Sequence, residues 1–370
     1  MFLAVLLPLE ALMIFSFAFV PYVTRRTELF GVSVPSDQID APELMRLKRI
    51  YLGVMMLLGV LLMGLTCVFG VDANWEDPQV IWFVVPLLLG YVVAAFVVYL
   101  PCHFAMKRLK AGKDWDDPSR PAVITVSTAA PAADTISPAW LLLFPLVIVI
   151  WLVAIWVVWP QVPDPVPTHY GLDGLPDTFV PKGVMAVLPM ALVQVVLAGI
   201  LAGVFCIIRR ARRQTDAAKP EQSLAQDMRF RRWNSIFMVV LGVVTLAFTS
   251  TTQIITMLGV VSNGFIFLPT VILVVFIGIA VWVMMFRIGQ GGSRIRTRAA
   301  QATGAVNYDD DRFWKLGTFY FNPEDPAVFV EKRFGVGWTN NFARPLTWVL
   351  VVGLLVLVAG LIVTTVLMTR

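Results

Sequence analysis

The twenty residues from Trp140 to Trp159 read WLLLFPLVIVIWLVAIWVVW and contain no charged side chain. A helix of this length is about 30 Å long, which matches the hydrocarbon thickness of a bilayer. Lipid offers no water to backbone N–H and C=O groups, so such a block is predicted to be a helix that satisfies its own hydrogen bonds. Seven further blocks have a similar length and composition: 2–22, 51–70, 80–100, 184–208, 236–258, 265–286 and 347–368.

The overall composition agrees with these blocks. Of the 370 residues, 58% are hydrophobic and only 14% are charged, and the mean hydropathy is +0.78. These values exclude an ordinary water-soluble domain as the starting expectation. The sequence therefore predicts an all-α polytopic membrane protein with eight transmembrane helices and a small hairpin-like segment before the last one.

The cations are distributed unevenly between the predicted loops. Loops 23–50, 101–139, 209–235 and 287–346 hold 5, 5, 8 and 9 Lys or Arg residues, whereas loops 71–79, 160–183 and 259–264 hold 0, 1 and 0. Cytoplasmic loops of membrane proteins carry the excess of Lys and Arg. We therefore expect a multi-pass protein of the plasma membrane, with both termini and loop 160–183 outside the cell.

Five regions follow from these spans and loops. They are a three-helix N-terminal region at 1–139, a helix–loop–helix unit at 140–210, a helical hairpin with a basic linker at 211–308, an aromatic and basic cytoplasmic segment at 309–345, and the last transmembrane helix at 346–370. The glycine-rich run from Gly289 to Gly292 lacks the pattern of a phosphate loop and is predicted to be a flexible exit from the seventh span.

The predicted spans hold few polar side chains. Glu10 is ionisable, and a charge near the middle of a membrane helix is costly, so it should be protonated or hydrogen-bonded to a neighbour. The expected neighbour is a polar stripe on the sixth span, whose members are Thr245, Thr249, Thr252, Gln253 and Thr256. The stripe has two interpretations: hydrogen bonds between helices, or a polar lining for a cavity or path.

The external loop at 163–182 contains five prolines and two glycines. This composition excludes a helix and predicts a rigid, turn-rich surface directly above the membrane. His169, Asp173, Asp177 and Lys182 are the candidate ligand-binding residues, because a stiff loop holds polar groups in fixed positions. In the alternative interpretation, Asp and Gly serve turns and Lys182 marks the membrane entry of the fifth span.

The same loop resembles a known family. The pattern resembles the external domain of unknown function in membrane proteins related to the immunity protein of the bacterial sporulation-delaying toxin system. The matching positions are Pro163, Pro167, His169, Gly171, Gly174, Asp177, Phe179 and Lys182. The resemblance implies a non-enzymatic protein that meets a secreted peptide or an envelope component at its outer face.

The segment 309–342 resembles a second uncharacterised domain that is often joined to the first. Its runs Gly317 to Phe321 and Val328 to Lys332 have the composition of short strands around an Asn-Pro-Glu-Asp-Pro turn. Such a segment would lie against the inner headgroups or against the helix bundle. The stretch from Phe30 to Pro35 and the basic helical run that ends at Arg49 could pack with it.

Known catalytic and cofactor motifs are missing from the sequence, so we expect no enzyme activity and no cofactor. Cys67, Cys102 and Cys206 share no metal-site or disulfide spacing, and His103 and His169 fall on opposite sides of the predicted membrane. The expected partners are membrane lipids, an extracellular peptide toxin or envelope ligand, and a cytosolic regulator, but not nucleic acid. The small-residue face around Gly199 and Gly203 adds a homo-oligomer to these expectations.

Two functions are compatible with these features. The first is recognition of an extracellular ligand with a relay to the cytoplasm, in which 309–342 is the output surface. The alternative is a permease for a small or lipid-like substrate, whose route is lined by Glu10 and the polar stripe.

Overall fold

The computed structural model describes residues 2–35, 38–72, 79–113, 115, 135–170, 175–213, 220–259, 267–295 and 311–368. Within these residues the chain is mainly helical, and every predicted apolar block falls on a helix. The helices are α1 (Phe2–Ala18), α2 (Val20–Val23), α3 (Pro42–Asp72), α4 (Gln79–Gly112), α5 (Leu143–Val158), α6 (Leu188–Arg210), α7 (Pro220–Met257), α8 (Phe267–Ile288) and α9 (Pro345–Met368), with the 3-10 turns η1 (Pro138–Leu142), η2 (Trp159–Gln161), η3 (Val184–Ala186), η4 (Gln290–Gly292) and η5 (Asp311–Phe313).

Six of the described helices are long and apolar enough to cross a bilayer. They cover Pro42–Phe69, Phe83–Gly112, Pro138–Gln161, Leu188–Arg210, Glu221–Met257 and Pro269–Gly292. The apolar stretches described in α1 and α9, Leu6–Ala18 and Pro345–Leu357, are shorter. The chain therefore has the character of a multi-pass helical membrane protein, while the count of eight spans stays a prediction.

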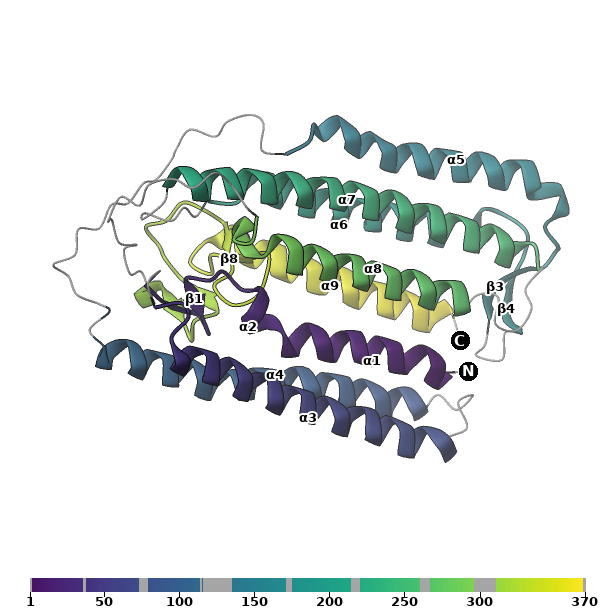
Figure 1. Ribbon diagram of the computed structural model, residues 1–370. Coiled ribbons are helices and arrows are strands. Elements are labelled where there is room, and N and C mark those ends of the chain that lie inside the picture. The colour runs from purple at the N-terminus through teal and green to yellow at the C-terminus, as the bar shows by residue number, and fades with distance from the viewer. Residues whose placement is uncertain are drawn as a thin grey trace.

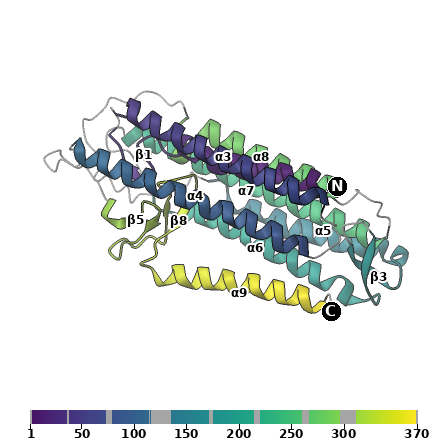
Figure 2. The same ribbon diagram turned by 90° about the horizontal axis from the view of Figure 1, so that it is seen from below.

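The helices form two groups that run side by side (Figure 1). In one group α1 packs on α3 and α8, and α3 packs on α4; in the other, α5, α6 and α7 pack on one another. The last helix, α9, lies at the edge of the bundle (Figure 2). Buried side chains of the first group, such as Tyr51, Met55 and Tyr99, join α3 and α4 in one core, and Phe144, Leu201 and Leu246 do the same for α5, α6 and α7.

Several helices extend beyond the apolar blocks that predict them. Helix α7 begins at Pro220, sixteen residues before the predicted span at 236, so part of the predicted basic linker is helical. Nine of the twelve residues from Glu221 to Arg232 are Arg, Gln, Glu, Ala, Leu or Met, which all favour helix, although the segment as a whole is polar. Proline occupies the first position of α3, α7 and α9, where its missing N–H leaves no hydrogen bond unmade.

In the described parts of the chain, eight short strands form four antiparallel hairpins. The pairs are β1 (Glu28–Leu29) with β2 (Val32–Ser33), β3 (Val166–Tyr170) with β4 (Pro176–Val180), β5 (Trp314–Lys315) with β6 (Phe319–Tyr320), and β7 (Phe329–Glu331) with β8 (Trp338–Asn340). The sequence places strands on both sides of the Asn-Pro-Glu-Asp-Pro turn, but β6 and β7 do not pair with each other. Each pairs with its own neighbour across a glycine-containing turn, and a bridge between Tyr320 and Asn341 joins the two hairpins.

The hairpins divide between the two ends of the bundle (Figure 1). The β3–β4 hairpin lies at one end, called here the hairpin end, together with the start of α1 and the end of α9. The other three hairpins lie at the opposite end, called here the basic end. This arrangement places both chain ends on the side of the Pro-rich segment, as the sequence predicts, without showing which side of a membrane that is.

Candidate functional site

The predicted turn-rich loop is a β-hairpin. Val166 pairs with Val180 and Pro167 with Phe179, and the register shifts beyond Pro167, so the prolines fall in short strands rather than only in turns. Two-stranded ribbons tolerate this because each strand has one free edge, where a missing N–H costs nothing. Val166 is buried among residues of α5 and α7, including Trp151, Ile155 and Met257. The base of the hairpin is therefore part of the helix core.

Two predicted ligand-binding residues meet on the exposed part of this hairpin. Nδ1 of His169 lies 2.6 Å from Oδ1 of Asp177, and the two side chains are 58% and 49% exposed. Partial burial of the carboxyl raises the pKa of Asp177. The hydrogen bonds from His169 and Thr178 lower it more, so the pKa lies below its ordinary value. The pair thus presents a hydrogen-bond donor and a hydrogen-bond acceptor to solvent in a fixed arrangement.

The other two candidates have different outcomes. The ammonium group of Lys182 donates to the carbonyl of Val162 at 2.6 Å and lies over the ring of Trp159, 5.5 Å from its centroid. This placement agrees with the alternative role of Lys182 at the membrane entry of the fifth span. Asp173 lies outside the described residues.

Tyr170 connects the hairpin to the end of a long helix. Its hydroxyl donates to the carbonyl of Thr256 at 2.8 Å, in the last turn of α7. Together with the contact of Val166 with Met257, this bond fixes the hairpin to α7.

The predicted neighbour of Glu10 is wrong. The hydroxyl of Thr66, on α3, donates to Oε1 of Glu10 at 2.7 Å, and both side chains are buried. The reason is the helix arrangement, because α1 packs on α3 and α8 while the polar stripe belongs to α7 in the other group. Oε2 of Glu10 has no hydrogen-bond partner among the described residues.

The polar stripe on α7 serves mainly its own helix and one neighbour. The hydroxyl of Thr249 donates to the carbonyl of Thr245 at 3.0 Å, and that of Thr252 to Phe248 at 2.9 Å. Gln253 is buried, and close to it along the chain Ser250 donates to Gln194 of α6 at 3.3 Å. The hydroxyls of the stripe thus bond carbonyls of their own helix, the bond between helices comes from Ser250 outside the stripe, and both interpretations of the stripe stay predictions.

The basic end contains a buried charged cluster that the sequence did not indicate. Glu331 of β7 is fully buried and accepts from Arg25 at 2.6 Å, while Nη2 of Arg231 lies 4.0 Å from its other oxygen. Burial raises the pKa of Glu331 to about 7. The positive charges of Arg25 and Arg231 lower this pKa, and the negative charges of Asp227 and Glu28 raise it. Three segments that are distant in sequence thus meet at one carboxyl group.

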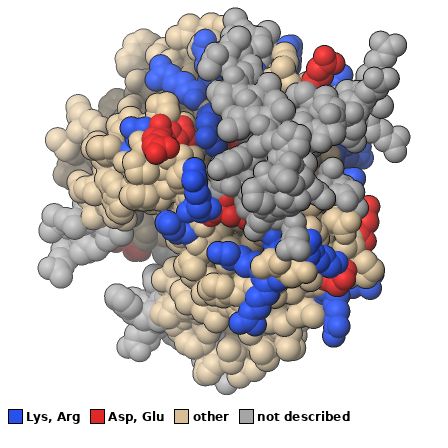
Figure 3. Space-filling view, turned by 90° about the vertical axis from the view of Figure 1, so that its left-hand side faces the viewer, with Lys and Arg blue, Asp and Glu red and all other residues tan. Residues whose placement is uncertain are grey.

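Arg231 also closes the end of a helix. Its guanidinium donates to Asp227 at 2.9 Å and to the carbonyls of Ile208 and Ala211 at 2.8 and 3.0 Å. The last carbonyls of a helix lack internal partners, and a cation there is favourable. Arg231 therefore ties α6 and α7 together beside Glu331. Lys and Arg side chains are scattered over the described surface of this end, with several Asp and Glu side chains among them (Figure 3).

The segment before α9, residues 311–344, is called here the C-terminal unit. It packs against the helix bundle, one of the two predicted positions. Phe334 stacks on Phe30 with 5.5 Å between ring centroids, which confirms the expected packing of the Phe30 stretch. The hydroxyl of Tyr99 on α4 lies 3.0 and 2.8 Å from the carbonyl oxygens of Phe30 and Leu316, which share its one hydrogen. Asp311 binds Lys110 of α4 and Arg333.

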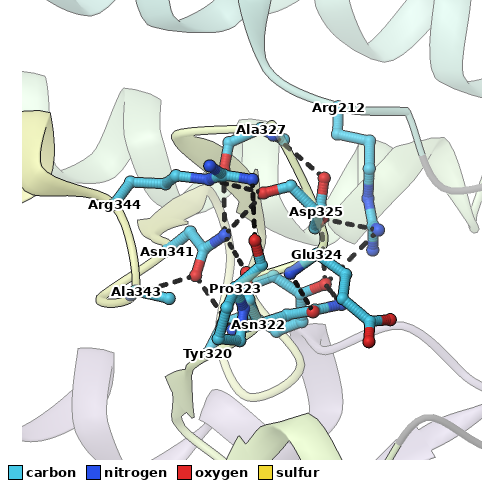
Figure 4. A network of polar contacts seen from close by, with 10 residues as sticks. All are labelled: Arg212, Tyr320, Asn322, Pro323, Glu324, Asp325, Ala327, Asn341, Ala343 and Arg344. Atoms are coloured by element: carbon cyan, nitrogen blue, oxygen red, sulfur yellow. Dashed lines mark hydrogen bonds and ion pairs between the residues drawn. The ribbon is translucent and has the colours of Figure 1, made fainter.

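The interior of the C-terminal unit is a polar network around one amide (Figure 4). Nδ2 of Asn341 donates to the carbonyls of Asn322, Asp325 and Ala327 at 2.9, 3.1 and 3.2 Å. Its Oδ1 accepts from the backbone N–H of Asn322 and Ala343 at 3.1 and 3.2 Å. The Asn-Pro-Glu-Asp-Pro turn is therefore held by this buried side chain, together with Arg344, whose guanidinium donates to the carbonyls of Asp325 and Pro323 at 2.7 and 3.1 Å.

An arginine fastens this turn to the second helix group. Arg212, just after α6, donates to the carboxylate of Asp325 at 2.8 Å, and the hydroxyl of Tyr320 donates to the same oxygen at 2.9 Å. The backbone N–H of Arg212 also donates to the carbonyl of Phe329 at 3.0 Å.

The glycine run after α8 is a packed turn and not a flexible exit. Gln290, Gly291 and Gly292 are buried, and the side chain of Gln290 bonds both the N–H and the C=O of Gly337, at 2.7 and 3.0 Å. Gly292 has φ +72°, and a Cβ there would collide with the carbonyl of Gln226 on α7. The glycines are needed because this turn fits closely against α7.

Among the described residues, no three His, Cys, Asp or Glu side chains lie close enough to hold a metal ion.

Two family models match parts of the chain. A domain of unknown function, DUF1648, matches residues 139–193, which include α5, the β3–β4 hairpin and the start of α6. A family of unknown function, DUF5808, matches residues 323–348, from the Asn341 network to the first turn of α9. No curated protein and no solved structure matches the chain. The matches fall on the two segments that the sequence assigns to uncharacterised domains, and neither names the toxin-immunity family.

Proposed function

We propose that this protein recognises an extracellular peptide or envelope ligand through the β3–β4 hairpin and relays this event to the C-terminal unit in the cytoplasm. In this proposal eight helices span the plasma membrane, the hairpin and both termini lie outside, and no reaction is catalysed. The excess of Lys and Arg at the basic end supports the orientation. The resemblance to toxin-immunity proteins supports the kind of ligand.

The observation that carries the proposal is the His169–Asp177 pair on a hairpin whose base is anchored. The two side chains are held 2.6 Å apart and stay half exposed. A preorganised donor and acceptor bind a ligand without a large loss of conformational entropy. Val166 and Tyr170 fix the strand that carries His169 to the helices. A ligand that displaces the His169–Asp177 pair would therefore also displace the end of α7.

The inward relay rests on the continuity of α7. This helix runs unbroken from Pro220 to Met257, with the hairpin at one end and Asp227 and Arg231 at the other. Arg231 lies beside Glu331 of the C-terminal unit. A shift or rotation of α7 therefore changes the surroundings of a buried carboxyl group.

A permease has less support. Its route would need Glu10 and the polar stripe to share a path, yet Glu10 bonds Thr66 in the first helix group and Ser250 bonds Gln194 in the second. The two sets of polar groups stabilise different helix pairs.

The recognition step is tested with the variants His169→Ala and Asp177→Ala. Cells that express each form at equal membrane abundance are challenged with a panel of purified cationic antimicrobial peptides, chosen because Asp177 offers a carboxylate. We expect the wild type to raise the inhibitory concentration of at least one peptide several-fold and both variants to lose this effect. Glu43→Gln is the matched control, because it removes a partly exposed ion pair with Lys113, 3.0 Å long, at the other end of the bundle. Equal protection by all four forms, or none by the wild type, contradicts the proposal.

The orientation is tested separately by cysteine labelling. In a chain whose native cysteines are replaced by alanine, Leu175→Cys lies on the hairpin and Lys315→Cys lies on the C-terminal unit, both exposed. A membrane-impermeant maleimide should label position 175 in intact cells and position 315 only after lysis. The reverse pattern overturns the orientation.

A further inference from the structure

Strand β6 and the residues after it have an inverted burial pattern. Phe319 and Phe321 are each 44% exposed, whereas Tyr320 and Asn322 between and beside them are buried and bonded to each other at 3.2 Å. A strand with one face in water normally turns its apolar side chains inward and its polar ones outward. Here the polar side chains are inside, so the phenylalanine face is expected to meet an apolar medium.

The exposed face continues onto two membrane helices. The ring of Phe319 lies 6.4 Å from that of Phe96 on α4 and 5.8 Å from that of Phe342, which in turn lies 5.9 Å from Trp348 in the first turn of α9. Trp348 is itself half exposed, and its indole N–H donates to the carbonyl of Phe342 at 3.1 Å. Aromatic side chains at the end of a membrane helix mark the boundary between hydrocarbon and headgroups. The row Phe96, Phe319, Phe342 and Trp348 is therefore placed at that boundary.

One cation lies beside this aromatic row, and two more lie further along α4. Lys315 is the cross-strand partner of Phe319 and is exposed. Lys107 and Arg108 lie in the last turns of α4, the helix that carries Phe96. Long basic side chains beside aromatic ones suit an anionic lipid surface, since the stems stay in the apolar layer and the charges reach the headgroups.

We propose that the phenylalanine face of the C-terminal unit is a phospholipid-binding surface, inserted at the headgroup boundary of the leaflet at the basic end and selective for anionic lipid. The occupant is lipid because the face is continuous with the outer sides of α4 and α9 and carries cations. The C-terminal unit is then held between the helix bundle on its Phe334 side and the bilayer on its Phe319 side. This inference needs only that the bundle spans a bilayer, and it does not depend on recognition at the hairpin.

The test places spin labels on the full chain in vesicles. With Cys67, Cys102 and Cys206 replaced by alanine, Phe319→Cys and Phe321→Cys each carry a nitroxide, and Glu324→Cys on the exposed turn of the same unit is the matched control. Collision rates with oxygen, which concentrates in lipid, and with a nickel chelate, which stays in water, are compared in vesicles of phosphatidylcholine with and without phosphatidylglycerol.

We expect the labels at 319 and 321 to meet oxygen several-fold more often than the nickel chelate, and the label at 324 to show the reverse. Adding Lys315→Gln to the Phe321→Cys chain should shift that label toward water, as should removal of phosphatidylglycerol. A label at 321 as accessible to nickel as that at 324 overturns the proposal. Shielding from both reagents also overturns it, because a protein surface would then cover the face. Insertion that does not change with phosphatidylglycerol removes the selectivity for anionic lipid.

Discussion

Replacing Asn341 by alanine should unfold the C-terminal unit locally while leaving the helix bundle folded. The buried amide makes five hydrogen-bond contacts with backbone groups of residues 322, 325, 327 and 343: Oδ1 accepts from two N–H groups, and three carbonyls share the two hydrogens of Nδ2. Each buried backbone group left without a partner costs about 1–3 kcal/mol, although these costs do not add fully. We therefore expect the variant to lose about 3–5 kcal/mol of local stability.

Hydrogen–deuterium exchange of the purified full chain measures this loss. Since about 1.4 kcal/mol corresponds to a factor of ten, protection of backbone amides in 319–342 should fall by about two to three and a half orders of magnitude. Asn340→Ala is the matched control: the same residue type is removed one position earlier, where the backbone keeps its pairing with Phe329. Its protection should stay within about a factor of two, as is usual for substitutions away from such networks. If the two variants exchange alike, the network of Asn341 does not hold this unit together.

Three further predictions concern other parts of the fold. Burial raises the pKa of Glu331 above its ordinary value, so the proton that this carboxyl holds in the folded chain favours folding at low pH, and this contribution is lost as the pH rises through the raised pKa; the thermal midpoint should fall from pH 5 to pH 8, and a rise contradicts this. Gly292→Ala combines a positive φ with a collision against α7 and should lower the midpoint by several degrees, while Gly203→Ala, inside α6 with nothing within 4 Å of the added Cβ, should not lower it. Tyr170→Phe removes the bond to Thr256, worth about 1 kcal/mol, and should speed exchange in the β3–β4 hairpin; unchanged exchange there would show that the bond does not anchor it.

The helices could be predicted from the sequence because the signal for each is local. The block 140–159 has no charged residue and is long enough to cross a bilayer. Both features can be read from the block alone, without knowledge of the rest of the fold. The extension of α7 back to Pro220 was missed because its first turns are polar, and hydropathy alone detects only the apolar part. Helix propensity over 220–235 was the available signal.

The polar contacts could not be predicted because they depend on which helix faces meet. Glu10 and Thr66 are 56 positions apart, and Arg25 and Glu331 are 306 apart. Along the chain, Glu331 sits in a basic and aromatic stretch that is equally typical of a solvated surface. Only the packing of the C-terminal unit against η4 and the segment after α2 makes it a buried charge. On the hairpin, by contrast, His169 and Asp177 are only eight positions apart in the sequence, so their proximity can be predicted from it.

The two uncharacterised segments are connected through one helix, and this connection limits how any relay can work. From Thr256, which holds the hairpin, to Arg231, which lies beside Glu331, α7 rises about 37 Å. A helix of this kind carries a displacement only if the far end has a second arrangement to adopt. Glu331 is the group at this end whose surroundings a shift of α7 would change, because its carboxyl is buried beside Arg25 and Arg231, and burial raises its pKa. The proposed relay therefore requires that binding at His169 and Asp177 change the proton affinity of Glu331, and by reciprocity that the pH at the basic end change ligand affinity at the hairpin.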